Sequence, residues 1–158
     1  MSIPNTIPPS GGWPVVIFQH NLGRDKYDLF RLADVYGEAG CVGIATDALL
    51  HGDRRTEPDQ EALFLSGTGT ATAAHTLQSL VDLSALTRFV GEALPEKLAV
   101  NPSRIYLHAE SGGGIIAAPH LAFDPRISGG ILSFVGGNLP RIATENTLTK
   151  KTPELAIG

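Results

Sequence analysis

Short strand-like segments alternate with helical segments along this chain, and this alternation is the feature that most constrains its fold. Four segments have the apolar character of buried strands, and they are Val15–Phe18, Cys41–Ala45, Arg104–His108 and Ile127–Val135. Three segments between them carry apolar residues at helical spacing, and they are Asp25–Gly40, Thr72–Leu94 and Gly112–Leu121. Strands that alternate with helices form a parallel sheet. The pattern therefore predicts an α/β fold, a three-layer parallel sheet with helices on both faces.

The chain divides into a lead-in, one core and a tail. Its 158 residues suffice for one domain, and no repeat marks a second domain. Residues 1–14 hold four prolines and two glycines, which predicts an extended lead-in. The core is expected to span 15–137, and residues 138–158 are expected to form an irregular tail.

Composition and charge exclude several classes of function. The net charge of −4 leaves no basic footprint for nucleic acid. No apolar run reaches the roughly 18 residues of a membrane helix, so no integral membrane segment is expected. No histidine or cysteine pair has the spacing of metal ligands, and we predict no metal and no cofactor. No signal peptide is visible in this chain, and the compartment stays open.

The sharpest motif is Ala109-Glu110-Ser111-Gly112-Gly113, between a predicted strand and a predicted helix. A nucleophilic serine must be lifted clear of the sheet, and a tight strand-to-helix turn does this through a strained backbone. The residues two before and two after the serine must then be small, as they are here. The motif predicts that Ser111 is a nucleophile. The alternative is a serine that only caps the helix.

The same glycines also match a second motif. Gly112 to Ala117 fits the G-x-G-x-x-G/A pattern of dinucleotide binding. That interpretation needs an acidic residue at the end of the next strand, but Phe134–Asn138 contains no carboxylate. Rossmann-like dinucleotide binding therefore stays a lesser alternative.

The loop after the first strand, His20-Asn21-Leu22-Gly23, is a candidate oxyanion loop. Acyl transfer at a serine requires two backbone N–H donors, one after the nucleophile and one from an earlier loop. The N–H of Gly112 is the expected first donor. The N–H of Leu22 is the expected second donor, with that of Asn21 close behind.

Taken together, these segments resemble the α/β hydrolases, in particular bacterial lipases of the secreted virulence-factor type. The segments that carry the resemblance are Pro14–His20, Asp47, His51–Arg54, Asn101–Ile105 and Asp124–Ile127, within roughly residues 13–142. The resemblance implies a partial α/β-hydrolase fold and a serine esterase or lipase acting on small-molecule or lipid esters. Asn21 departs from the family, which has glycine after the histidine.

The family's triad continues with an acid and then a histidine, and neither follows Ser111 here. No histidine lies after His120, and neither His108 nor His120 is placed to reach the serine oxygen. The resemblance therefore implies that the triad acid and histidine come from sequence beyond this chain or from a partner, and that this chain alone turns over slowly. His20 and His51 are expected to hydrogen-bond their loops.

Two further expectations concern the surroundings of the motif. Asp47 and Asp53 are expected to cap loops and pair with Arg54 or Arg55. The last predicted strand would leave an open sheet edge, which favours homo-oligomerisation through that edge. The function from another class is a non-catalytic α/β-hydrolase fragment that acts in binding or assembly.

Overall fold

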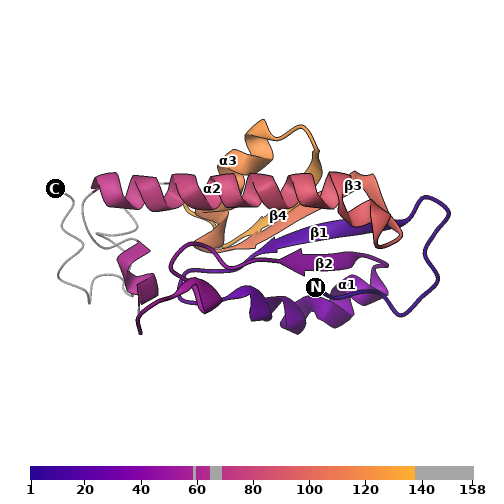
Figure 1. Cartoon of the computed structure of the whole chain (residues 1–158), viewed down its shortest axis with the longest axis horizontal. Helices are drawn as coiled ribbons and strands as arrows, with labels where there is room; N and C mark the ends of the chain where they lie inside the picture. The colour runs from indigo at the N-terminus through magenta and orange to yellow at the C-terminus, as the bar shows by residue number, and fades with distance from the viewer. Residues whose placement is uncertain (59, 65–68, 138–158) are drawn as a thin grey trace.

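Four parallel strands form one sheet, as the alternation predicts. The computed structural model describes residues 1–58, 60–64 and 69–137. The strands are β1 (Trp13–Gln19), β2 (Val42–Ala45), β3 (Val100–Glu110) and β4 (Ile127–Ser133). Their order across the sheet is β2-β1-β3-β4, and every neighbouring pair is parallel. Figure 1 shows the strands pointing toward one end of the molecule.

Helices cover both faces of this sheet, which gives the three layers that the sequence predicts. The α-helices are α1 (Ala33–Glu38), α2 (Gly69–Glu92) and α3 (Gly113–Phe123). The short 3-10 helices are η1 (Lys26–Leu32), η2 (Gly52–Arg54), η3 (Gln60–Phe64) and η4 (Leu94–Glu96). α2 and α3 lie on one face, whereas η1 and α1 lie on the other (Figure 1). Asp25 begins the expected helical segment Asp25–Gly40, and its residue type is typical of N-caps. It caps the start of η1, because its side chain accepts a 2.8 Å hydrogen bond from Tyr27 N–H.

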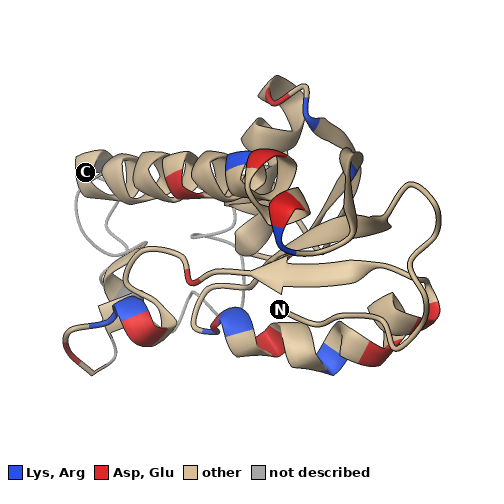
Figure 2. Ribbon diagram, turned by 45° about the vertical axis from the view of Figure 1, so that its right-hand side comes forward, with Lys and Arg blue, Asp and Glu red and all other residues tan. Residues whose placement is uncertain are grey.

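The alternation of side chains along β1 builds a core on each face. Val15 and Ile17 belong to the large cluster under α2 and α3. Phe18 points the other way and packs with Leu29 and Tyr36, from η1 and α1. The central strand is therefore buried on both faces, as its continuous apolar run requires. Charged residues lie mainly on helices and loops rather than along the sheet (Figure 2).

The first strand pair also recruits part of the lead-in. Ser2 and Gly43 exchange two backbone hydrogen bonds, at 2.8 and 3.0 Å, in an isolated antiparallel bridge. Gly43 tolerates no side chain here, because a Cβ would lie 2.6 Å from Ser2 Oγ and 2.8 Å from the Tyr36 ring. The bridge therefore occupies part of the outer edge of β2.

The inner face of α2 differs from the face that its apolar residues suggest. The helical spacing of the apolar residues in the segment Thr72–Leu94 predicts that Leu77, Val81 and Phe89 face the core, but they are 61%, 61% and 40% exposed. The buried face carries Leu83 together with the polar Thr87, whose hydroxyl hydrogen-bonds Leu83 O at 2.9 Å and His120 Nε2 at 2.8 Å. The expectation is wrong for these three residues because hydroxyls that are satisfied locally can replace apolar groups on a buried helix face.

A matched pair of substitutions tests this orientation of α2. Leu83→Ala should lower the free energy of unfolding by about 2–5 kcal/mol, because Leu83 is fully buried. Leu77→Ala, six residues earlier on the exposed face, should change it by less than about 0.5 kcal/mol. Urea unfolding followed by circular dichroism measures both values. Equal losses for the two variants would contradict the orientation.

Candidate active site

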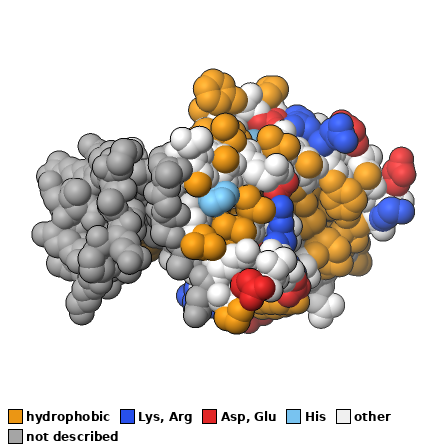
Figure 3. Space-filling model, turned by 60° about the vertical axis from the view of Figure 1, so that its left-hand side comes forward, with side chains coloured by type: hydrophobic (Ala, Val, Ile, Leu, Met, Phe, Trp, Pro, Cys, Tyr) orange, Lys and Arg blue, Asp and Glu red, His pale blue; other side chains and the backbone are white. Residues whose placement is uncertain are grey.

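The carboxyl ends of β1 and β3 lie side by side at the centre of the sheet. Gln19 is in register with Ala109, so the loops that follow these two residues start next to each other. From this point the chain crosses to β2 on one side and to β4 on the other. Ligands of open α/β sheets bind at such a switch point. Figure 3 turns this end forward and shows many hydrophobic side chains on the described part of the face.

The turn at Ser111 has the backbone of a sharp strand-to-helix elbow. Ser111 has a φ of 49°, a positive value that non-glycine residues seldom adopt. Its N–H donates to Ser133 O at 2.8 Å, and its carbonyl accepts from Gly114 N–H at 2.9 Å as α3 begins. The side chain is half-buried, and its hydroxyl has no hydrogen-bond partner within the described part of the chain. An unpaired hydroxyl thus stands at the positive end of a helix.

Close packing explains why the residues after Ser111 are glycines. A Cβ on Gly113 would lie 2.3 Å from His20 O and 2.7 Å from Gln19 O, so the start of α3 lies directly on the backbone after β1. A Cβ on Gly114 would lie 2.0 Å from the Val135 side chain. The glycines of the dinucleotide-like motif are thus packed against this chain's own atoms, which leaves them no open approach for a pyrophosphate.

The two other elbow residues lie on opposite faces of β3. Ala109 is fully buried against the α2 and α3 side. Glu110 alternates to the other side, where its charge acts on Tyr36 and His108. Burial, reinforced by Glu110, raises the pKa of Tyr36. Tyr36 Oη and His108 Nδ1 are 2.6 Å apart.

The candidate oxyanion loop touches the start of α3. Gly112 N–H donates a 3.0 Å hydrogen bond to the side-chain Oδ1 of Asn21. Leu22 packs over the same glycine, because a Cβ there would lie 2.3 Å from Leu22 Cγ. No described residue accepts a hydrogen bond from Leu22 N–H. Of the residues expected to line an oxyanion site, Asn21, Leu22 and Gly112 are therefore brought together. The bond to the Asn21 side chain was not foreseen.

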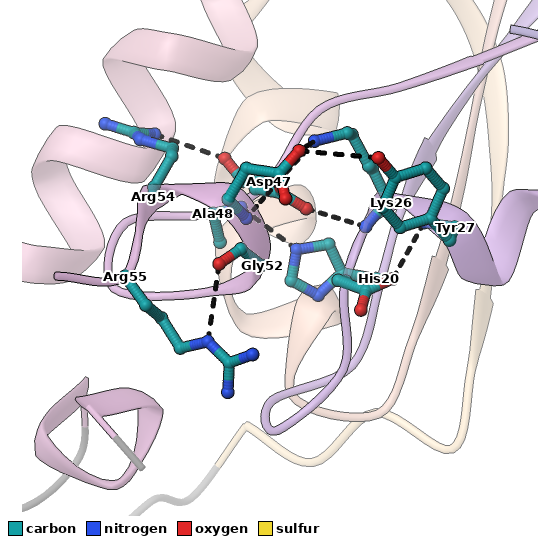
Figure 4. Close-up of polar contacts among 10 residues, drawn as sticks. His20, Lys26, Tyr27, Asp47, Ala48, Gly52, Arg54 and Arg55 are labelled. Atoms are coloured by element: carbon teal, nitrogen blue, oxygen red, sulfur yellow. Dashed lines mark hydrogen bonds and ion pairs between the residues drawn. The ribbon is translucent and has the colours of Figure 1, made fainter. Parts of the chain in front are cut away.

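His20 holds the loop after β1 in place through two hydrogen bonds of its ring. Its Nε2 accepts a hydrogen bond from Ala48 N–H at 2.9 Å, so the ring hydrogen is on Nδ1, which donates to Asn21 O at 2.7 Å. Burial lowers the pKa of His20, which keeps this ring neutral. Figure 4 shows His20 bridging the loop after β1 and the loop after β2.

His51 packs beside His20 in the same region. The two ring centroids are 5.3 Å apart, and the His51 Nδ1 is 2.8 Å from Leu49 O. Its Nε2 is buried without a hydrogen-bond partner within the described residues. All five histidines of the chain are described, and no hydrogen bond joins any of them to Ser111. The described part of the chain therefore shows no serine–histidine pair.

Asp47 holds the loop after β2 through Lys26 (Figure 4). Its carboxylate accepts from Lys26 N–H and Lys26 Nζ, both at 2.8 Å, and from Asp53 N–H at 2.9 Å. Lys26 also pairs with the Asp53 carboxylate. The expected partner Arg54 does not pair with the Asp47 carboxylate. Arg54 donates to the Asp47 carbonyl and pairs with Asp82 at 2.5 Å, across the loop on α2.

The pKa of Asp47 is lowered by these contacts. Burial of the carboxylate raises its pKa, but the hydrogen bonds from Lys26 and from Asp53 N–H outweigh this effect. The side chain is 2% exposed and all its contacts hold structure. Asp47 therefore serves to position the loop.

Metal-binding clusters and membrane-spanning helices are both absent from the described residues. In the described ranges, no group of three or more His, Cys, Asp or Glu side chains is placed to hold a metal ion. None of the described helices is long and apolar enough to span a membrane.

Several solved structures share the architecture of this chain. It is similar to a thermostable carboxyl esterase from Bacillus coagulans, with a TM-score of 0.64, 22% identity, and coverage of 90% of this chain and 41% of that one. It is also similar to a putative dienelactone hydrolase from Klebsiella pneumoniae (TM-score 0.62, 18% identity, 86% and 54% covered). A third similar structure is the α/β hydrolase GrgF from Penicillium (TM-score 0.59, 21% identity, 85% and 43% covered).

These similarities define the fold. No sequence model of a protein family matches the chain, and no curated sequence is similar to it. The chain nevertheless has the α/β-hydrolase fold, of which it contains a part. It spans only 41% to 54% of the length of these three structures.

The contact of Gly113 with the backbone after β1 can be tested by adding one methyl group. Gly113→Ala should lower the free energy of unfolding by about 1–3 kcal/mol, because the new Cβ overlaps His20 O. Gly37→Ala, in α1 with open space around the added Cβ, should leave stability unchanged or raise it by up to about 1 kcal/mol. Thermal unfolding of both variants gives the comparison, and a Gly113→Ala protein as stable as wild type would argue against the contact.

The pairing of Asp47 predicts a loss of stability in acid. Because its pKa is lower in the folded state than in the unfolded state, its contribution is present above the unfolded pKa of about 4 and is lost as pH falls through the folded pKa. Asp47→Asn should cost about 1–3 kcal/mol at pH 7 and flatten the decline of stability below about pH 4.

Urea unfolding between pH 7 and pH 2 measures this dependence. Asp34→Asn is the matched control, since Asp34 is exposed and has no hydrogen-bond or ion-pair partner among the described residues. An unchanged acid decline in Asp47→Asn would show that another group dominates it.

Proposed function

We propose that the protein is a carboxylic-ester hydrolase, an esterase or lipase, and that Ser111 is its nucleophile. The observation that carries the proposal is the positive φ of Ser111 at the β3–α3 turn, beside the loop that follows β1. A folded protein keeps such strain where the surrounding structure and a function demand it. The elbow geometry is also the one that α/β-hydrolase chemistry uses.

The proposed reaction begins with attack of Ser111 Oγ on the ester carbonyl carbon. A C–O bond forms, the carbonyl electrons move to the oxygen, and the Oγ proton passes to a general base. Collapse of this intermediate expels the alcohol and leaves an acyl-serine, which water then hydrolyses to the acid. Gly112 N–H and Leu22 N–H would stabilise the oxyanion, aided by the N-terminus of α3.

The base is expected to be a histidine oriented by an acid, as in the Ser–His–acid triads of this fold. In this proposal the histidine is none of the five in residues 1–158, and the histidine and the acid are both supplied from outside these residues or by a partner. No hydrogen bond joins a described histidine to Ser111, and three of the five are engaged elsewhere: His20 by Ala48 and Asn21, His108 by Tyr36, and His120 by Thr87. A protein without the base would react slowly, because an unassisted serine hydroxyl is a poor nucleophile.

The matched structures support the proposed substrate class, which is small-molecule or lipid esters. One of those structures is a carboxyl esterase and another a putative dienelactone hydrolase, which supports ester hydrolysis here too.

Labelling with a fluorophosphonate tests the proposal directly. The reagent should modify the full-length protein once, at Ser111, because its phosphorus captures an activated serine. Ser111→Ala should abolish labelling. Ser128→Ala, which removes another hydroxyl from the exposed face of β4, should not affect it. Mass spectrometry of the digested protein identifies the labelled residue. Absence of label on Ser111 would refute the proposal.

A further inference from the structure

The Asn21 side chain occupies a position that the proposed reaction needs. Its Oδ1 lies 3.0 Å from Gly112 N and accepts a hydrogen bond from the N–H group that would stabilise the oxyanion. A substrate carbonyl oxygen bound to the same N–H would have to lie at the same hydrogen-bond distance. The two oxygens cannot occupy this place together.

The backbone of Asn21 is held, whereas its side chain can turn. Asn21 O accepts hydrogen bonds from Arg24 N–H at 3.2 Å and from His20 Nδ1 at 2.7 Å. His20 is in turn fixed by Ala48 N–H, so the loop is tied to the segment after β2. The side chain of Asn21 is only half-buried and pivots on two single bonds.

From this arrangement we infer that the Asn21 carboxamide is an internal occupant of the oxyanion site that the substrate must displace. This inference rests on the proposed function. It makes the Asn21 side chain a gate, by which we mean a group that blocks the oxyanion site until the substrate displaces it. In the free protein, Asn21 Oδ1 satisfies the N–H of the buried Gly112, a donor that would otherwise lack a partner among the described residues. When an ester binds, its carbonyl oxygen takes over this N–H and the carboxamide rotates away.

Asn21 Oδ1 and the substrate oxygen compete for Gly112 N–H, and this competition favours the transition state over the bound substrate. The amide oxygen of Asn21 and the carbonyl oxygen of an ester are both neutral acceptors, so their exchange at Gly112 N–H gains little. The oxyanion that forms during attack is charged and accepts a much stronger hydrogen bond. Displacement of Asn21 therefore becomes favourable as the reaction proceeds.

Removal of the carboxamide should open the site. Asn21→Ala should react with a fluorophosphonate about two- to tenfold faster than wild type, the factor that one neutral hydrogen bond contributes. Hydrogen exchange at the Gly112 amide should accelerate in the same variant, since its acceptor is lost. This exchange reports the contact itself and does not depend on the reaction.

Asn21→Asp provides the opposite change with nearly the same shape. The introduced carboxylate keeps the hydrogen bond to Gly112 N–H and places a negative charge where the oxyanion forms. Labelling should be at least about tenfold slower than wild type at pH 8, with the ratio to wild type rising toward one as the carboxylate is protonated in acid. A role in folding alone would not produce this pH dependence.

Asn101→Ala is the matched control, because the Asn101 carboxamide also accepts a backbone N–H, from Ser103 at 2.9 Å, but near the start of β3. Its labelling rate should equal that of wild type. If Ser111 of the wild-type protein is not labelled, the proposed function and the gate both fail.

If the wild-type protein is labelled, two results overturn the gate alone. The first is a folded Asn21→Ala protein that reacts no faster than wild type. The second, which applies even if Asn21→Ala does not fold, is an Asn21→Asp protein that reacts at the wild-type rate at pH 8.

Discussion

The approach of Gly113 to the backbone after β1 is the constraint on which the rest of this structure depends. The Gln19 and His20 carbonyls lie so near Gly113 that no side chain fits between them. This contact sets where α3 begins, and therefore forces the chain at Ser111 through a positive φ. It also holds the candidate oxyanion loop against the same helix start. One close contact thus determines the position of both halves of the candidate site.

The polar groups around this contact are of two kinds: some are paired and hold the loops in place, and others have no hydrogen-bond partner among the described residues. His20 and Asp47 have their side-chain hydrogen-bonding groups engaged with neighbouring loops, and they hold the segments after β1 and β2 in place. The Ser111 hydroxyl and the Leu22 N–H, by contrast, have no hydrogen-bond partner among the described residues. Rigid loops that surround a few unpaired groups are the arrangement expected where a ligand supplies the missing partners.

Local patterns in the sequence predicted the fold well, and contacts between distant segments set the limit. The strands, the Asp25 cap and the sharp turn at Ser111 follow from short runs of residues. The bond between Asn21 and Gly112 joins residues 91 positions apart, and no local pattern indicates it. The buried face of α2 differs from the predicted one for a related reason, since one of the two partners of the buried Thr87 hydroxyl is His120 Nε2 from α3.

The two edge strands of the sheet, β2 and β4, differ in how far the backbone groups on their outer side are already paired. On β2, the N–H and C=O groups of Gly43 both hydrogen-bond Ser2. β4 has no further strand beside it among those described. Among the described residues, the outer edge of β4 is therefore more open to pairing with a further strand than that of β2. A symmetric pair of copies joined there by a twofold axis through the sheet would place two β4 strands antiparallel, which interrupts an otherwise parallel sheet. An added strand that follows a helical crossover would instead continue the existing direction.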